Sequence, residues 1–215
     1  MGDAMTEELE EYIAAHISPE PAVLQRLDHD THLQLLYPTM CSGHIQGRLL
    51  KMLVRMVNPQ RVLELGTYSG YSALCLAEGL LSDKAVVHTI EVDDELEDFI
   101  TSHLSQAPWG HRVHLHIGDA AAVLPTIEGD FDLAFIDANK RDYTAYYDLV
   151  MLRVRSGGFI VVDNTLWYER VVDQQRYHDA QTQGIRDFND RVANDSRVEV
   201  AMIPLRDGLT IIYKK

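Results

Sequence analysis

The chain has 215 residues, 46% of them hydrophobic, which suits one globular domain with a sizeable core. Its 19 Lys and Arg against 33 Asp and Glu leave a formal net charge of −14, so its field disfavours nucleic acids and anionic membranes as partners and favours neutral or cationic small molecules. The two cysteines, Cys41 and Cys75, indicate no disulfide framework. Because we find no membrane-length apolar run and no signal-peptide pattern, we expect a cytoplasmic protein.

The first quarter of the chain has a helical pattern. From Glu7 to about Val57 the apolar residues recur with helical spacing, Pro19, Pro21 and Pro38 interrupt the pattern, and no run resembles a strand. The pattern predicts an N-terminal helical layer within residues 1–57.

After residue 58 the sequence pattern changes to short runs rich in β-branched residues, which alternate with amphipathic segments. The expected strands are 61–65, 85–92, 113–117, 131–137 and 159–163. Strands that alternate with helices predict right-handed βαβ units and a parallel sheet covered on both faces.

The last two expected strands, 198–205 and 209–213, are separated only by Arg206-Asp207-Gly208, so we expect a hairpin and at least one antiparallel strand. We therefore predict an α/β fold, with a Rossmann-like, doubly wound and mostly parallel sheet of seven strands. The predicted single domain spans residues 1–215, of which 58–215 form the Rossmann-like core.

A glycine-bearing turn follows the first strand. Gly66 and Gly70 are spaced G-x-x-x-G, and a helical pattern comes next, which is the first unit of a nucleotide-type site. Tyr68 replaces the second glycine of the G-x-G-x-x-G motif, so a dinucleotide is disfavoured, and no Lys-Ser or Lys-Thr pair follows to form a P-loop. An NAD-dependent dehydrogenase remains the alternative enzyme class.

Carboxylates end the next two strands. Glu91 lies 25 residues after Gly66, where the ribose of an adenosine group is expected, and Asp119 and Ala120 end the third strand where an adenine edge is expected. The alternative interpretations are a solvated or capping charge for Glu64, within the first strand, and a helix N-cap for Asp119.

Oxygen-bearing side chains also end the fourth and fifth strands. If these strands are parallel neighbours, Asp137, Asp163 and Asn164 converge at one edge of the sheet, with Lys140 close by. Three hard oxygen ligands beside an amine predict a divalent cation site next to a general base. Taken singly, these residues also suit a helix cap, a turn pair and a solvated lysine.

Together these motifs give the chain a family resemblance. Val62–Ser72, Ile136–Lys140 and Val162–Thr165 are similar to the cofactor loop and the two metal motifs of the metal-dependent class I S-adenosylmethionine O-methyltransferases, the group that contains caffeoyl-CoA and catechol O-methyltransferases. The resemblance covers nearly the whole chain. It implies a methyltransferase that forms a homodimer, with the N-terminal helices at the dimer interface.

The resemblance also implies roles for individual residues. The S-adenosylmethionine site would comprise Met40, Glu64, Gly66, Tyr68, Ser72, Glu91, Asp119, Ala120 and Asp137. Mg²⁺, or Mn²⁺ or Ca²⁺ in its place, would be bound by Asp137, Asp163 and Asn164, and Lys140 would be the catalytic base.

The expected acceptor is a small or medium catechol-like phenol. Asn139 stands where many relatives have an acidic residue, and Thr210 stands where animal catechol enzymes have a glutamate, which argues against simple catecholamine specificity. Trp167 and Tyr168 would wall the aromatic ring, or else form a core or dimer-contact pair. A non-catalytic protein that binds the cofactor is the remaining alternative.

Overall fold

The computed structural model describes residues 7–215, so the first six residues of the predicted helical layer lie outside it. The helices are α1 (Glu7–His16), α2 (Ala22–Gln34), α3 (Gly43–Val57), α4 (Tyr71–Gly79), α5 (Glu97–Gln106), α6 (Ala120–Val123), α7 (Tyr143–Met151) and α8 (Ala180–Ala193). The strands are β1 (Arg61–Leu65), β2 (Val86–Glu91), β3 (Val113–Ile117), β4 (Phe131–Ile136), β5 (Val154–Asp163), β6 (Val198–Ile203) and β7 (Leu209–Lys214).

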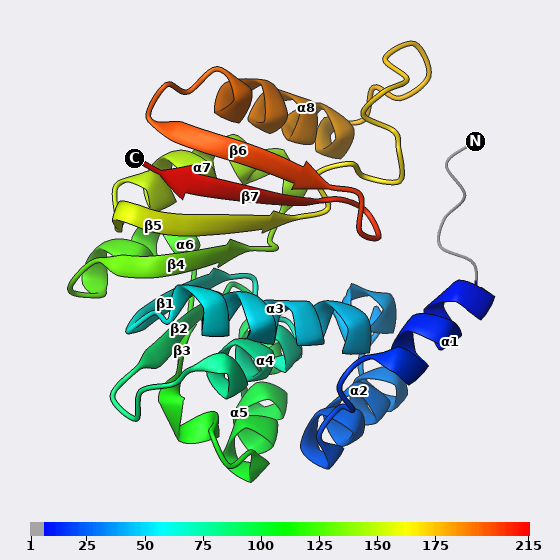
Figure 1. Cartoon of the computed structure of the whole chain (residues 1–215), viewed down its shortest axis with the longest axis vertical. Helices are drawn as coiled ribbons and strands as arrows, with labels where there is room; N and C mark the ends of the chain where they lie inside the picture. The colour runs from blue at the N-terminus through cyan, green and yellow to red at the C-terminus, as the bar shows by residue number, and fades with distance from the viewer. Residues whose placement is uncertain (1–6) are drawn as a thin grey trace.

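The seven strands form one sheet in the order β3-β2-β1-β4-β5-β7-β6. Strands β1 to β5 pair in parallel, whereas β7 is antiparallel to both β5 and β6. Figure 1 shows the sheet through the middle of the molecule, with α3 and α4 over one face and α6 and α7 behind it. The predicted fold class, with its antiparallel terminal hairpin and N-terminal helices, is confirmed. The assignment of residues 1–215 to one domain stays a prediction.

Two strand boundaries differ from those expected by two residues or more, and three other strands differ by one residue at one end or both. Strand β5 begins at Val154, which pairs with Phe131 before the register shifts, because the polar and glycine-rich start of this strand carries no apolar pattern. Strand β6 ends at Ile203, two residues early, because Pro204 has no N–H to donate to the next ladder bond.

The sheet separates two hydrophobic clusters, because successive side chains of a strand point to opposite faces. Val62 of β1 belongs to the cluster that includes Leu50 of α3 and Leu74 of α4. Its neighbour Leu63 belongs to the cluster on the opposite face, with Phe188 of α8. The alternation in β1 thus fixes which helices cover which face.

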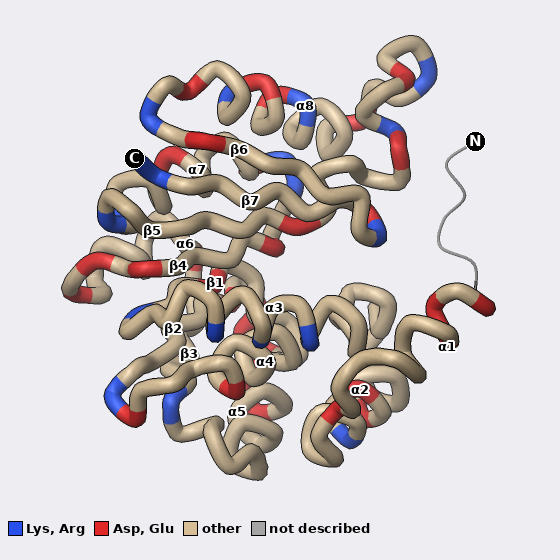
Figure 2. The backbone as a smooth tube through the Cα atoms, viewed as in Figure 1, with Lys and Arg blue, Asp and Glu red and all other residues tan. Residues whose placement is uncertain are grey.

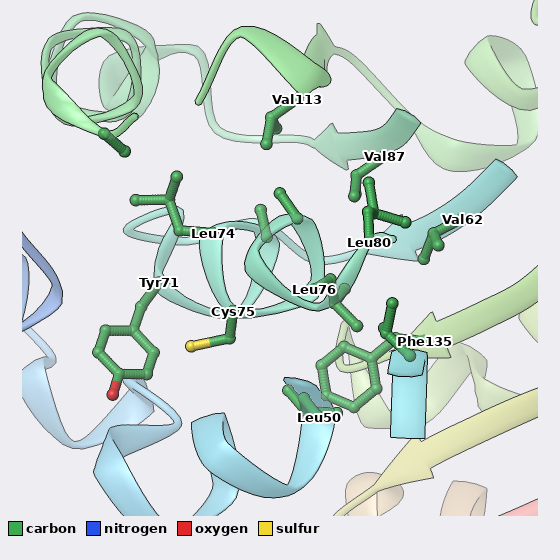
Figure 3. Close-up of a cluster of buried hydrophobic side chains, with 14 of the residues drawn as sticks. Leu50, Val62, Tyr71, Leu74, Cys75, Leu76, Leu80, Val87, Val113 and Phe135 are labelled. Carbon is green, nitrogen blue, oxygen red and sulfur yellow. The ribbon is translucent and has the colours of Figure 1, made fainter. Parts of the chain in front are cut away.

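Helices α3 and α4 approach each other closely at two glycines. A Cβ on Gly47 would lie 2.7 Å from Cys75 Sγ, and one on Gly79 would lie 2.7 Å from Val54 Cβ. Figure 3 shows the surrounding cluster, with Cys75 among the labelled side chains of α4. This contact holds α3, and therefore its first turn, in a fixed position beside the sheet.

The acidic residues are spread along the chain rather than gathered in one segment. Figure 2 shows them on elements throughout the described chain, among them α1 and α8.

Cys41 and Cys75 are both buried, and they form no disulfide with each other. None of the helices within residues 7–215 has the length and apolar character that crossing a bilayer requires.

Candidate functional site

The carboxyl ends of the parallel strands open onto one cavity of about 940 Å³. Its other walls come from residues 34–42 before α3, from the loop after β5 and from the loop between β6 and β7. Every site residue predicted from the sequence except Glu64 lines this cavity: Met40, Gly66, Tyr68, Ser72, Glu91, Asp119, Ala120, Asp137, Asn139, Lys140, Asp163, Asn164, Trp167 and Tyr168. Strand ends that are distant in sequence meet here because the strands are parallel.

Gly66 joins the two sides of the cavity. Its φ is +94°, and a Cβ at this position would lie 2.0 Å from the carbonyl oxygen of Asp137. Two backbone hydrogen bonds hold the contact: Gly66 N donates to Ile90 O over 3.0 Å, and Asp137 N donates to Leu65 O over 2.9 Å. A glycine is needed here because the turn after β1 lies directly on the end of β4.

The Glu91 carboxylate anchors the glycine turn. Its Oε2 accepts hydrogen bonds from the N–H groups of Thr67 (3.1 Å) and Tyr68 (2.7 Å), and its Oε1 accepts from Asp93 N over 2.9 Å. Since a carboxylate oxygen accepts more than one hydrogen bond, Glu91 retains capacity for a ligand hydroxyl at the cavity edge.

Glu64 lies apart from the other predicted residues, fully buried in β1 and outside the cavity lining. Thr89 Oγ1 donates to its Oε2 over 2.5 Å, whereas its Oε1 has no hydrogen-bond partner among residues 7–215. Burial raises the pKa of this carboxyl from 4.5 to about 8. The alternative of a solvated charge at Glu64 is therefore wrong, and a positive charge brought near its unpartnered oxygen would stabilise the ionised form.

Asp119 caps α6. Its Oδ1 accepts hydrogen bonds from Ala121 N (2.9 Å) and Ala122 N (3.2 Å), so the N-cap interpretation is confirmed. The same residue lines the cavity, and so does Met40, which is 56% exposed in the wall before α3.

The second half of the cavity holds the predicted base and cation ligands. Lys140 Nζ donates to Asp137 Oδ1 over 2.6 Å. The Asp163 carboxylate accepts from Gln46 Nε2 at Oδ2 (2.6 Å) and from the backbone N–H of Asn164 at Oδ1 (2.8 Å). Burial, together with the nearby charge of Asp137, raises the pKa of Asp163 to about 6.

This donor set fits an oxygen-preferring divalent cation. Asp163 is buried and the nearby charge of Asp137 helps to raise its pKa, so a cation bound by both carboxylates would relieve this repulsion. Residues 7–215 contain no cluster of three His, Cys, Asp or Glu side chains that is placed to hold a metal ion. The third ligand that the family resemblance implies, Asn164, would supply an amide oxygen beside the two carboxylates. Carboxylate and amide oxygens are the ligands that Mg²⁺ and Ca²⁺ use.

Sequence reasoning missed Gln46 and Arg206. Gln46 is 1% exposed and lies on the same stripe of α3 as Leu50 and Val54, four and eight residues later. A polar residue in an otherwise apolar stripe was the available signal. Arg206, from the β6–β7 loop, donates from its Nη1 to Gln46 Oε1 over 3.1 Å and also to the backbone oxygen of Ser42.

The loop after β5 is fixed by Arg186 of α8, also missed from the sequence. The Arg186 guanidinium is buried and donates to four backbone oxygens between residues 170 and 177, over 2.7 to 3.0 Å: those of Arg170, Val171, Asp173 and Tyr177. This side chain therefore ties the far part of the loop to α8.

The Trp167 and Tyr168 rings lie 5.5 Å apart in the near part of this loop. Trp167 packs against the hydrophobic cluster on the α7 and α8 face, whereas Tyr168 is 66% exposed. Asn139, in the loop after β4, also lines the cavity and donates to Asp142 Oδ2 over 2.6 Å.

Several cavity residues have a left-handed backbone although none is glycine. They are Tyr68, Asn164, Trp167, Tyr168 and Arg206, with φ between 47° and 57°. Such conformations cost about 1 to 3 kcal/mol each and cluster at functional sites.

Comparison with known proteins agrees with this architecture. The model of the O-methyltransferase family matches residues 13–215. The chain is 30% identical over 190 residues to "Probable caffeoyl-CoA O-methyltransferase 2" of Dictyostelium discoideum, covering 86% of this chain and 79% of that protein. It is 34% identical over 174 residues to "Catechol O-methyltransferase domain-containing protein 1" of Mus musculus, covering 79% and 66%.

Among solved structures, the O-methyltransferase TomG of Streptomyces achromogenes, determined in complex with S-adenosylmethionine, superposes with a TM-score of 0.90 at 30% identity and covers 97% of this chain and 96% of that one. The family match over most of the chain, the shared sheet topology and the strand-end cavity agree. The chain belongs to the S-adenosylmethionine-dependent O-methyltransferase family.

Proposed function

We propose that this protein transfers the methyl group of S-adenosylmethionine to one hydroxyl of a catechol-like small molecule, with the help of a divalent cation. The observation that carries the proposal is the contact at Gly66, which places the anchored Glu91 turn and the Lys140–Asp137–Asp163 group on the walls of one cavity. The TomG complex and the name of the mouse relative support the donor and the acceptor class, respectively.

The donor is assigned to the wall built by β1, β2 and β3. Glu91 would accept hydrogen bonds from the ribose hydroxyls, and Asp119 and Ala120 would border the adenine. Gly66, Tyr68 and Ser72 would surround the methionyl part, with Met40 covering it. Glu64, beneath this wall, would face the cationic sulfonium group with a carboxyl whose ionised form the positive charge favours.

The acceptor is assigned to the wall built by β4 and β5. A divalent cation held by Asp137, Asp163 and Asn164 would orient a vicinal diol and lower the pKa of its hydroxyl. Lys140 Nζ, beside Asp137, would first release a proton to solvent and then, as a neutral amine, take the hydroxyl proton.

The oxygen would then attack the sulfonium methyl, so that a C–O bond forms as the C–S bond breaks and S-adenosylhomocysteine leaves. The reaction joins an anion to a cation, so fixed positions and a partly dehydrated cavity favour it.

The acceptor class follows from the remaining walls. Trp167 and Tyr168 offer an aromatic wall, with Asn139 on the side of Lys140. Thr210 is 1% exposed and donates from Oγ1 to Thr165 Oγ1 over 2.8 Å, so this position supplies no carboxylate to a second hydroxyl. We therefore propose a neutral catechol-like phenol as the acceptor. We also propose that the protein is a homodimer and is located in the cytoplasm.

A methyl-transfer screen over catechols, flavonoids and hydroxycinnamoyl esters, with and without Mg²⁺, tests the proposal. We expect transfer to vicinal diols that requires Mg²⁺. Methyl transfer that EDTA leaves unchanged would contradict the role of the cation. A binding competition between NAD and S-adenosylmethionine distinguishes a methyltransferase from the alternative, an NAD-dependent dehydrogenase. Inertness across the whole panel, with S-adenosylmethionine still bound, would favour a non-catalytic binding protein.

A further inference from the structure

We propose that Gln46 is a positioning residue for the acceptor side of the site: its amide fixes the carboxylate of Asp163 for cation binding, and Arg206 fixes the amide. The inference rests on the proposed function, because that proposal assigns Asp163 to the cation. It adds two residues from distant parts of the chain, one in the first turn of α3 and one in the β6–β7 loop.

The hydrogen-bonding roles determine the orientation of the amide. A guanidinium only donates, so Arg206 must face the carbonyl oxygen of Gln46, as its 3.1 Å contact to Oε1 shows. The NH₂ group then faces the Asp163 carboxylate, 2.6 Å away, which only accepts when ionised. A flipped amide would set oxygen against carboxylate and NH₂ against guanidinium, so the two charged partners select one orientation.

Because both side chains are buried, the loss of either hydrogen bond would be costly. Gln46 is 1% exposed and Asp163 is 5% exposed, so water does not replace a lost partner easily. The two oxygens of Asp163 each accept one protein hydrogen bond, from Gln46 and from Asn164 N, which restrains the rotation of the carboxylate and leaves each oxygen able to bind a cation. Outer hydrogen bonds of this kind orient metal ligands and contribute strongly to affinity.

Arg206 has a second bond that keeps the arrangement in place. Its Nη1 also donates to the backbone oxygen of Ser42, just before α3, so the β6–β7 loop is attached to the start of the helix that carries Gln46. Removal of Arg206 would free the amide to rotate without creating a cavity in the core, since this side chain is exposed.

The test is titration of the full-length protein with Mn²⁺ alone by calorimetry, without acceptor. We expect Gln46→Met, which keeps the length of the side chain and loses its hydrogen bonds, to weaken Mn²⁺ binding about 10- to 100-fold. S-adenosylhomocysteine, titrated separately, should bind as in the wild type. Arg206→Met should weaken Mn²⁺ binding in the same direction, and the double variant should be no weaker than Gln46→Met, because both act through one amide.

Tyr147→Phe is the matched control, because it removes another buried hydrogen bond, 3.0 Å to Asp195 Oδ2, outside the cavity lining. It should leave the Mn²⁺ affinity unchanged. Wild-type Mn²⁺ affinity in Gln46→Met and Arg206→Met, or parallel loss of S-adenosylhomocysteine binding, would overturn the inference while the proposed function stands. If Gln46→Met does not fold, the Arg206→Met result decides. Failure of the wild type to bind Mn²⁺ would overturn both.

Discussion

Lys140 and Asp137 form an ion pair of 2.6 Å between Nζ and Oδ1, with side chains only 13% and 20% exposed. The Lys140 ammonium also lies 5.3 Å from the centre of the Tyr143 ring. The proposed base and a proposed cation ligand are thus held together by a direct contact. A hydroxyl that binds at Asp137 would therefore arrive beside the amine that is to deprotonate it.

Replacement of this amine should stop the reaction and leave binding intact. We expect Lys140→Ala to lower the rate of methyl transfer about 10²- to 10⁴-fold, the range for a general base, with unchanged affinity for S-adenosylhomocysteine. Initial rates and calorimetry measure the two quantities. Lys84→Ala, at an exposed position before β2, serves as the control and should keep the wild-type rate. A Lys140→Ala enzyme of wild-type rate would show that another group takes the proton.

Removal of the cation should inactivate the enzyme reversibly. We expect EDTA to abolish methyl transfer and added Mg²⁺ to restore it, and Asp163→Asn to require more Mg²⁺ for half-maximal activity because one negative ligand is lost. Asp148→Asn, which removes an exposed carboxylate paired with Arg191, should not change the Mg²⁺ requirement. Equal Mg²⁺ requirements for wild type and Asp163→Asn would contradict the ligand assignment.

Gly66→Ala should destabilise the protein more than any change of backbone preference explains. A Cβ here meets the Asp137 carbonyl oxygen in addition to the unfavourable φ, so we expect the free energy of unfolding to fall by about 2 to 5 kcal/mol. Gly43→Ala is the control, since its φ is +73° but a Cβ there would meet no atom of the described residues within 4 Å, and it should cost only about 1 to 2 kcal/mol. Urea denaturation of both variants compares the costs; equal losses would rule out the contact at Asp137.

Glu64→Gln should change how stability depends on pH. The pKa of the Glu64 carboxyl rises from 4.5 to about 8 on folding, so the folded protein binds the proton of this carboxyl more tightly than the unfolded chain does. The unliganded wild type therefore loses stability as pH rises from about 4.5 to 8, by at most about 1.4 kcal/mol per pH unit from this group.

Glu64→Gln abolishes that loss while an amide oxygen remains to accept from Thr89. The difference in unfolding free energy between variant and wild type should shift in favour of the variant as pH rises through this window. Urea denaturation between pH 5 and 8 measures it, and a difference independent of pH would show that Glu64 is not the titrating group.

Arg186→Met should loosen the loop that carries Trp167 and Tyr168. Loss of four bonds to backbone oxygens frees residues 170–177, so we expect faster proteolytic cleavage there and a higher KM for the acceptor, with unchanged binding of S-adenosylhomocysteine. Arg153→Met, which removes a guanidinium that donates to three backbone oxygens of residues outside the cavity lining, is the control for a lost arginine anchor. Unchanged proteolysis in Arg186→Met would contradict the anchoring role.

The sequence predicts the sheet and most of the cavity because both depend on local signals. Strand-end residues such as Glu91 and Asp163 follow apolar runs whose ends meet once the strands are parallel. Gln46 and Arg206 were missed since they are joined only after α3 and the β6–β7 loop pack together, 160 positions apart in sequence. The complete burial of Glu64 depends on how helices cover the sheet, which strand periodicity alone does not specify.

The left-handed backbone at the cavity wall sets a conflict between stability and activity. At Tyr168, which is 66% exposed, a glycine would relieve the backbone at little cost in packing, yet it would delete a side chain that lines the cavity. Selection of this protein for heat resistance alone would therefore favour glycine at this position, and a more stable variant found in this way would be a poorer methyltransferase.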